Sequence, residues 1–302
     1  MRMSKVSVVV GMPVYNAEEW LESSIKSWLS QTRSDFRLVI SDNASSDASY
    51  EICEQFARCD PRIVVSRNPR NIGIYANFRR VFELGSDSDY FMWASSHDYF
   101  SPVTLERCVS TLEAREDAVL CCGGVKLFER DLENSVDYEE PVRADSDSPV
   151  ERFRAVVTTL RRNNFIHGII RTSALKRSRL VEDTTYGDKV LVAHLALMGK
   201  FVQLPDTLFY RRQDRGATTT KMDDLEISQH WDPLDRGTWK YNHWKTCRGL
   251  VRAVLDTALS PTQRFAALVL ALKCWYWERK RLAAELAEGL RTSLPRPGRT
   301  HG

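Results

Sequence analysis

The sequence predicts an α/β fold built on a doubly wound, mostly parallel β-sheet that is flanked by helices, with a helical C-terminal extension. Over residues 1–100, short β-branched runs alternate with segments of helical period, an order typical of such sheets. The apolar run 90–94 stops abruptly at a polar cluster, as buried parallel strands do at the edge of a sheet. A long C-terminal segment, 261–290, keeps helical spacing throughout.

The composition is that of an ordinary globular chain. Its 302 residues allow one large domain or two smaller ones. Hydrophobic residues make up 43% of the chain and charged residues 27%, which is typical of soluble proteins. A formal charge of +3 without a clustered basic stripe argues against nucleic acid as a partner. The seven cysteines form no C-x-x-C pair and indicate free thiols in a reducing compartment. Without a signal-peptide core or an apolar run of about 20 residues, a cytoplasmic protein is expected.

The elements of the first hundred residues follow a strand–helix alternation. Strands are expected at residues 6–11, 36–40, 62–65 and 90–94. Asn16 is the expected N-cap of the first helix, because Glu19 three residues later completes a capping box. Ser46 or Asp47 is expected to begin the second helix. The second and third helices are predicted at residues 50–57 and 74–84.

The rest of the chain alternates less regularly. Helices are expected at 102–112, 151–160 and 189–198, and extended segments at 118–125, 165–171, 201–204 and 208–211. The acidic, turn-rich stretch 130–149 is the best candidate for a mobile loop or a domain seam. Beyond residue 218 we expect a helical extension, 219–290, that ends in the helix 261–290 and is followed by a disordered basic tail, 291–302.

The polar cluster Ser95-Ser96-His97-Asp98 marks the expected binding site. It follows the strand 90–94 directly, and ligands of open α/β sheets bind beyond the carboxyl ends of the strands. Two strand–helix units before it are consistent with a crevice of the nucleotide-binding type. Neither G-x-G-x-x-G nor G-x-x-x-x-G-K-[ST] is present, which argues against the common dinucleotide and P-loop sites.

An ordered series of short motifs runs through residues 6–218. The motifs are G-M-P-V-Y-N (11–16), S-W-L-S-Q-T (27–32), S-D-N-A-S-S-D (41–47), N-P-R-N-I-G (68–73), Y-F-M-W (90–93) with H-D (97–98), G-I-I-R-T-S-A-L (168–175), G-D (187–188) and F-Y-R-R (209–212). Each is weak alone, but together they resemble the inverting family 2 glycosyltransferases of the GT-A fold. The resemblance implies a GT-A-like domain at 1–218, with a nucleotide-binding half at about 1–100 and an acceptor half at about 101–218.

The resemblance implies a nucleotide-sugar donor, UDP- or dTDP-linked, in the first half. By position, Pro13 and Tyr15 would flank the base, and Asp42 would accept a hydrogen bond from its N–H edge, because a carboxylate only accepts. The other implied donor contacts are Asn71, Arg79 or Arg80, Ser96, Asp98, Arg211 and Arg212. The competing interpretations are a turn-capping role for Asp42 and a solvated helix face for the arginines at positions 79 and 80.

Two further groups are needed for chemistry, a base for the acceptor hydroxyl and a positive group for the leaving diphosphate. Asp188 matches the position of the family's base, and the competing interpretation is an N-cap. The family's usual Asp-x-Asp is replaced here by Ser95-Ser96-His97-Asp98. His97, Asp98 and Asp214 could together hold Mn²⁺ or, less suitably, Mg²⁺. Alternatively activity is metal-independent, and Arg211, Arg212 or Arg215 neutralises the diphosphate.

Three classes of function stay open. The chain is an active glycosyltransferase, a degenerate non-catalytic relative that binds nucleotide, or an unrelated α/β nucleotide-binding protein. The expected acceptor is a hydroxyl group on a glycan, a lipid-linked or a small molecule. The C-terminal helix repeats apolar residues from Phe265 to Tyr276 at helical spacing, followed by basic residues. Packing or a homodimer is favoured for it, against peripheral contact with the inner face of the membrane.

Overall fold

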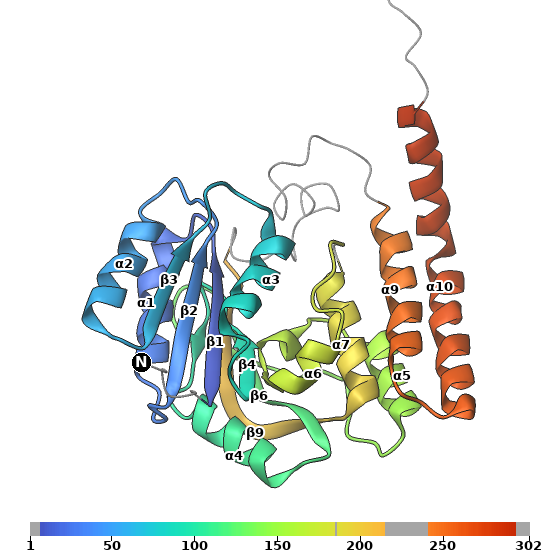
Figure 1. Ribbon diagram of the computed structural model, residues 1–302, viewed down its shortest axis with the longest axis horizontal. Helices are drawn as coiled ribbons and strands as arrows, with labels where there is room; N and C mark the ends of the chain where they lie inside the picture. The colour runs from blue at the N-terminus through green and yellow to red at the C-terminus, as the bar shows by residue number, and fades with distance from the viewer. Residues whose placement is uncertain (1–6, 185, 215–240, 294–302) are drawn as a thin grey trace, which may run out of the picture.

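The computed structural model describes residues 7–184, 186–214 and 241–293, and these residues fold around a nine-stranded sheet (Figure 1). The strand order is β3-β2-β1-β4-β8-β6-β9-β5, with β7 paired to β6 outside this path. Helices cover the sheet, and the predicted α/β fold with a mostly parallel sheet is confirmed. In the part of the chain that the structure describes, no helix is both long and apolar enough to cross a membrane.

The first half folds as the alternation predicts. The parallel strands β1 (Val8–Val14), β2 (Phe36–Asp42), β3 (Ile63–Arg67) and β4 (Tyr90–Trp93) are joined through α1 (Glu18–Leu29), α2 (Ser49–Cys59) and α3 (Ile74–Gly85). β1 lies in the centre, between β2 and β4, and its β-branched residues Val8, Val9 and Val10 are fully buried. Burial on both faces of the sheet explains why its strands are continuous apolar runs.

The N-termini of α1 and α2 are each capped by a carboxylate at the start of the other helix. Asp47 Oδ2 accepts the backbone N–H of Glu18, and Glu18 Oε2 accepts that of Ala48. The predicted N-cap role of Asn16 is wrong, since Asn16 has a positive φ of 46° and its Oδ1 accepts the N–H of Ser46 across the turn. The α2 cap position is Ala48, so neither Ser46 nor Asp47 is the cap residue. Tertiary pairing of two helix ends has replaced the local capping box.

The second half mixes strand directions. Its strands are β5 (Tyr99–Phe100), β6 (Ala118–Phe128), β7 (Val136–Tyr138), β8 (Ile169–Arg171) and β9 (Lys200–Arg212). β8 is antiparallel to both β4 and β6, whereas β9 is parallel to β6. β9 is one strand where two pieces were predicted. A register shift near Gly124 of β6 lets the strand continue through Pro205, which cannot donate to the ladder.

Helices complete the second half. They are α4 (Thr104–Ala114), α5 (Pro149–Thr159), the 3-10 turn η1 (Asn164–His167), α6 (Thr172–Arg177) and α7 (Gly187–Met198). The acidic stretch 130–149, predicted as a mobile loop or domain seam, is anchored to the domain. Val142 and Ala144 are buried in the core, and β7 pairs with β6.

The C-terminal extension is a helix pair, α9 (Asn242–Asp256) and α10 (Pro261–Ser293), which lie side by side (Figure 1). α9 lies within the predicted helical extension, 219–290, although its bounds were not predicted. Leu250 and Val254 of α9 and Leu270 of α10 belong to the same core as α5 and α7. Residues 215–240 and 294–302, where the predicted domain boundary and most of the tail fall, lie outside the described residues. The extension therefore shares the core of the sheet domain.

Candidate active site

Strand direction gathers polar residues at one edge of the sheet. β1, β2, β4 and β9 end at this edge, and antiparallel β8 begins there. The residues that follow β1, β2, β4 and β9 and those that precede β8 therefore lie close together. This is the edge at which open α/β sheets bind ligands.

The predicted base-binding residues lie at the ends of β1 and β2. Pro13 is half-buried, and Tyr15 is exposed. Asp42 is fully buried; its carboxylate accepts the Ser45 N–H at 3.2 Å and pairs with Arg67 Nε at 3.3 Å. The turn-capping role of Asp42 is thus present in the structure. Contact with a base stays a prediction for Asp42, Pro13 and Tyr15.

A buried amide network supports the next loop. Asn43 Nδ2 donates to Asn71 Oδ1 at 2.8 Å, and Asn77 of α3 accepts from Ser41 Oγ at 2.7 Å. Asn68 bridges the two, because its Nδ2 donates to Asn43 Oδ1 and to Asn77 Oδ1. Asn71 also accepts the Gly73 N–H. The side chain of Asn71 therefore fixes the loop between β3 and α3, and a nucleotide contact by Asn71 stays a prediction.

The two arginines of α3 differ. Arg79 Nη1 donates to the carbonyl of Val181 at 2.7 Å, which ties α3 to the segment before α7. Arg80 is exposed, as expected of a solvated helix face. Arg79 thus connects the two halves of the domain.

A buried arginine organises the polar cluster after β4. The N–H of Arg212 donates to Asp98 Oδ1 at 2.8 Å, and its Nε donates to the carbonyl of His97 at 3.1 Å. Its guanidinium pairs with Asp214 at 2.5 Å and lies over the ring of Trp20, 5.4 Å from the centroid. Ser96 is also buried here.

The three predicted metal ligands do not fit a metal ion. Asp98 accepts the Arg212 N–H, and Asp214 accepts from the Arg212 guanidinium. The contact of Arg212 with His97 is to the backbone carbonyl of His97, not to its ring. The His97 ring packs edge-on against Trp20, with 6.1 Å between centroids. Among the described residues no group of three or more His, Cys, Asp or Glu side chains is placed to hold a metal. Arg215 lies outside the described residues.

Asp188 lies in the first turn of α7. Tyr186 is the N-cap position, so the N-cap interpretation of Asp188 is wrong. Burial raises the pKa of Asp188, although the Asn163 amide, the Lys189 N–H and the Arg211 charge each lower it. Asp188 Oδ1 accepts the Lys189 N–H at 2.8 Å. A carboxylate with a raised pKa is a stronger base than an exposed one, as proton abstraction requires.

Arg211 is the cation near this carboxylate. It is half-buried at the end of β9, and its Nη1 donates to Asn164 Oδ1 at 2.7 Å. Its charge lowers the pKa of both Asp188 and His167, so Arg211 lies close to both groups. The Asn164 Nδ2 atom is buried and has no hydrogen-bonding partner among the described residues. A buried polar atom without a partner suits contact with a polar ligand.

His167 belongs to this group, and the sequence did not identify it. Its Nδ1 lies 2.8 Å from the carbonyl of Trp93, so Nδ1 carries the proton and Nε2 keeps its lone pair. Burial lowers the pKa of His167 to about 4, which keeps the ring neutral near pH 7. The strand 165–171 was expected, but its direction was not. Antiparallel pairing to β4 is what brings His167 to the edge.

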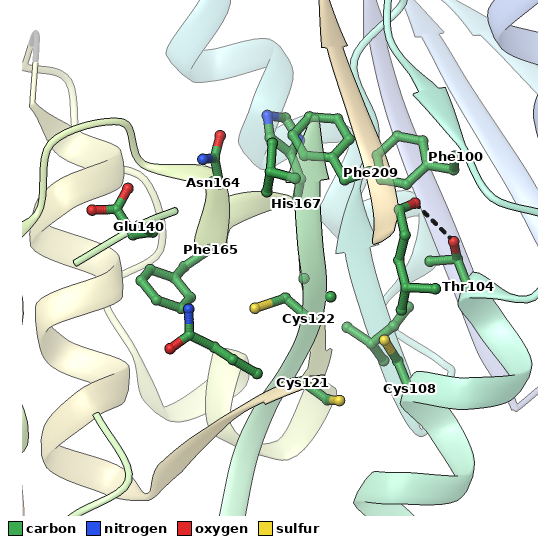
Figure 2. Close-up of a pocket in the computed structure, with 16 residues that line it drawn as sticks. Phe100, Thr104, Cys108, Cys121, Cys122, Glu140, Asn164, Phe165, His167 and Phe209 are labelled. Atoms are coloured by element: carbon green, nitrogen blue, oxygen red, sulfur yellow. Dashed lines mark hydrogen bonds between the residues drawn. The ribbon is translucent and has the colours of Figure 1, made fainter. Parts of the chain in front are cut away.

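Two hollows are present among the described residues, one beside residues of this edge and one away from it. A cavity of about 20 Å³ beside His167, Phe209 and Cys122 has room for a water molecule and not for a sugar (Figure 2). A larger hollow, about 450 Å³, is bordered by Asp89, Arg171 and Lys176. It lies beside Tyr90, the first residue of β4, and hence at the amino end of that strand. The candidate site is therefore the polar edge itself.

Comparisons of sequence match the chain to known proteins. A family model described as glycosyl transferase family 2 matches residues 9–183. The succinoglycan biosynthesis protein ExoA of Rhizobium meliloti (strain 1021) is 32% identical over 108 residues, which are 35% of this chain and 33% of ExoA. The chain spans 33% to 63% of the length of the first curated relatives that it matches.

Comparisons of structure find the same fold. S. aureus TarS 1–349, in complex with UDP-GlcNAc, gives a TM-score of 0.67 at 15% identity, over 94% of this chain and 81% of TarS. The mannosyltransferase PcManGT from Pyrobaculum calidifontis, in complex with GDP-Man and Mn²⁺, gives 0.50 at 14% identity, over 98% of this chain and 82% of PcManGT. At such identities the likeness concerns the fold alone.

Proposed function

The chain belongs to glycosyl transferase family 2, and from this premise we propose that it transfers a sugar from a UDP- or dTDP-linked donor to a hydroxyl acceptor with inversion. The observation that carries the proposal is the placement of Asp188, a carboxyl group with a pKa raised by burial, near the charge of Arg211. A base and a cation at one sheet edge are the two groups that this transfer needs. The complex of TarS with UDP-GlcNAc is in keeping with a nucleotide-sugar donor.

The proposed reaction is a single displacement. Asp188 accepts the proton of the acceptor hydroxyl while the oxygen of that hydroxyl forms a bond to the anomeric carbon. The bond between the anomeric carbon and the phosphate oxygen breaks on the opposite side, and its electron pair leaves with the nucleoside diphosphate. Arg211 stabilises the charge that develops on the leaving oxygen, because a guanidinium binds phosphate through two parallel N–H groups.

His167 is proposed to position a substrate hydroxyl. Its Nδ1–H is engaged by the Trp93 carbonyl, so Nε2 can only accept. A neutral acceptor beside a cation suits a sugar hydroxyl, which has a proton to donate. The unpaired Nδ2 of Asn164 offers a donor to the same substrate. Asp42, Asn71 and Tyr15 remain proposed contacts of the nucleotide.

The test is turnover of a panel of nucleotide sugars by the full-length protein, with and without EDTA and Mn²⁺. We expect donor hydrolysis or transfer that survives EDTA, since the described residues at the edge do not fit a metal. Loss of turnover in EDTA, with recovery on adding Mn²⁺, would overturn the arginine assignment. Calorimetric binding of UDP without turnover of any donor would instead identify the chain as the non-catalytic relative.

A further inference from the structure

One face of α10 carries large apolar side chains that are exposed. Phe265, Val269, Leu272 and Tyr276 are 70%, 38%, 55% and 65% exposed. Their spacings of four, three and four residues place them in one row along the helix. Trp277, 50% exposed, lies next to the row. The opposite side of α10 is the one that packs in the core, through Ala267, Leu270, Ala271 and Cys274.

Basic side chains follow and flank this row. Arg279 comes three residues after Tyr276, and its guanidinium carbon lies 4.2 Å from the Tyr276 ring centroid. Lys273 and Lys280, seven residues apart, are exposed beside the row. Residues 261–281 contain five basic side chains and one acidic side chain, Glu278. Glu278 pairs with Arg281 at 3.3 Å, so the exposed face is apolar and cationic.

The positive charge of the exposed face of α10 indicates which kind of partner binds it. A second copy of the chain in a parallel pairing would place the same cations opposite each other, and the row itself continues into Arg279. Exposed aromatic rings interleaved with lysine and arginine suit the interface of an anionic bilayer, where rings enter the headgroup layer and the cations contact lipid phosphates. We propose that the row from Phe265 to Tyr276, with Arg279, Lys273 and Lys280, binds the surface of an anionic lipid membrane.

The helix is held in a way that suits this role. α10 packs on α9 and α5, and α9 packs on α7, whose first turn carries Asp188. The lipid-facing side therefore points away from the core, and the sheet domain can remain folded while α10 lies flat on the bilayer. No residue of the candidate active site takes part in the contact.

Vesicle co-sedimentation of the full-length protein tests the proposal. We expect binding to vesicles that contain phosphatidylglycerol, little binding to pure phosphatidylcholine, and release by salt. Lys273→Glu with Lys280→Glu should weaken the partition coefficient about 5-fold or more for each charge changed. The triple variant Phe265→Ser, Leu272→Ser, Tyr276→Ser should lose binding. All these side chains are exposed, so the variants should keep the thermal midpoint of the parent.

Matched controls are Val136→Ser on β7 and Arg58→Glu on α2, two exposed positions on other elements, which should leave vesicle binding unchanged. Equal binding to neutral and anionic vesicles would overturn the proposal. So would unchanged binding of both α10 variants. A parent protein that binds no vesicles but dimerises in sedimentation equilibrium, with a monomeric triple variant, would assign the face to a second copy.

Discussion

At the scale of the residue, Asp188 is held where burial favours its protonated form, although a base must be ionised. Its folded pKa lies above the ordinary value of 3.8. The free energy of unfolding therefore falls as pH rises through that raised pKa, because the folded chain then loses a proton that it holds more tightly than the unfolded chain. A functional group that costs stability in this way is expected in an active site.

The first prediction concerns Asp188→Asn. Turnover should fall about 10²- to 10⁴-fold, the usual contribution of a general base, while the melting temperature near pH 7 should rise because the buried charge is gone. Steady-state kinetics and thermal unfolding measure the two effects. Asp183→Asn, an exposed acidic residue of the same segment, is the control for both. Asp188→Asn with full turnover would remove Asp188 from the mechanism.

The second prediction concerns Arg211. Arg211→Met should lower kcat about 10²- to 10³-fold, as loss of a charge-stabilising donor does, with partial recovery in Arg211→Lys. The Arg211 charge also lowers the pKa of Asp188, so the acid limb of the kcat–pH profile should move to higher pH in Arg211→Met. An acid limb that stays in place would show that the two groups do not interact. Arg80→Met, on an exposed helix face, is the matched control.

At the scale of the element, α7 buries a histidine that has no evident partner. His194 is fully buried, and neither ring nitrogen has a hydrogen-bonding partner among the described residues. Burial lowers the pKa of His194 from 6.5 to about 4. Below pH 6.5 the unfolded chain binds a proton that the folded chain refuses until about pH 4, so stability is lost over that interval as pH falls.

The third prediction follows from this histidine. His194→Leu should raise the free energy of unfolding by about 1–3 kcal/mol at neutral pH, the cost of an unpaired buried polar group. The gain should grow as pH is lowered from 6.5 towards 4, because the unfolded variant has no imidazole at this position to bind a proton. Urea unfolding at several pH values measures it. The same change at His243, whose Nδ1 lies 2.9 Å from Glu285 Oε1, should be destabilising. A destabilised His194→Leu would reveal a partner for the ring.

The strands and helices differ in how far the sequence determines them. The first four strands could be predicted because buried parallel strands are continuous apolar runs. The direction of β8 could not, since pairing to β4 depends on residues far away in the chain. His167 was missed for that reason. The bounds of α9 could not be predicted within the helical extension, because Gly249 and the basic residues of α9 dilute its helical period. That period runs through His243, Cys247, Leu250 and Val254.

The candidate site likewise contains residues that the sequence predicts and an arrangement that it does not predict. Asp188 and Arg211 follow from motifs in order along the chain. The placing of Arg212 between His97 and Asp214 does not, because it depends on the pairing of β5 with β9. A metal site at His97, Asp98 and Asp214 was expected from the resemblance, beside a metal-independent alternative. In the structure Asp98 and Asp214 accept hydrogen bonds from Arg212.

At the scale of the whole molecule, the C-terminal helices are part of the core. Leu270 and Leu282 of α10 are buried, and the side of α10 opposite the apolar row faces α5 and α9. Removing the chain from Pro261 onward would uncover both neighbours. A shortened chain is therefore unsuitable for testing membrane binding, and point variants are required.

The fourth prediction concerns the contribution of α10 to the free energy of unfolding. A chain that ends at Ser260 should lose at least about 3 kcal/mol of unfolding free energy from Leu270 and Leu282 alone. Phe265→Ser, on the exposed row, should leave the unfolding free energy unchanged within about 0.5 kcal/mol. Denaturant unfolding of both proteins compares them. Equal stability of the shortened and full-length chains would show that α10 is an appendage.

The carboxylates that cap the N-termini of α1 and α2 have an electrostatic consequence for the proposed donor. A helix N-terminus carries roughly half a positive charge and is a ready site for phosphate. Here the carboxylates of Glu18 and Asp47 already occupy the two ends nearest β1 and β2. Neither helix dipole is left to attract a diphosphate, so under the proposed function the phosphates of the donor would be bound by arginine side chains such as Arg211.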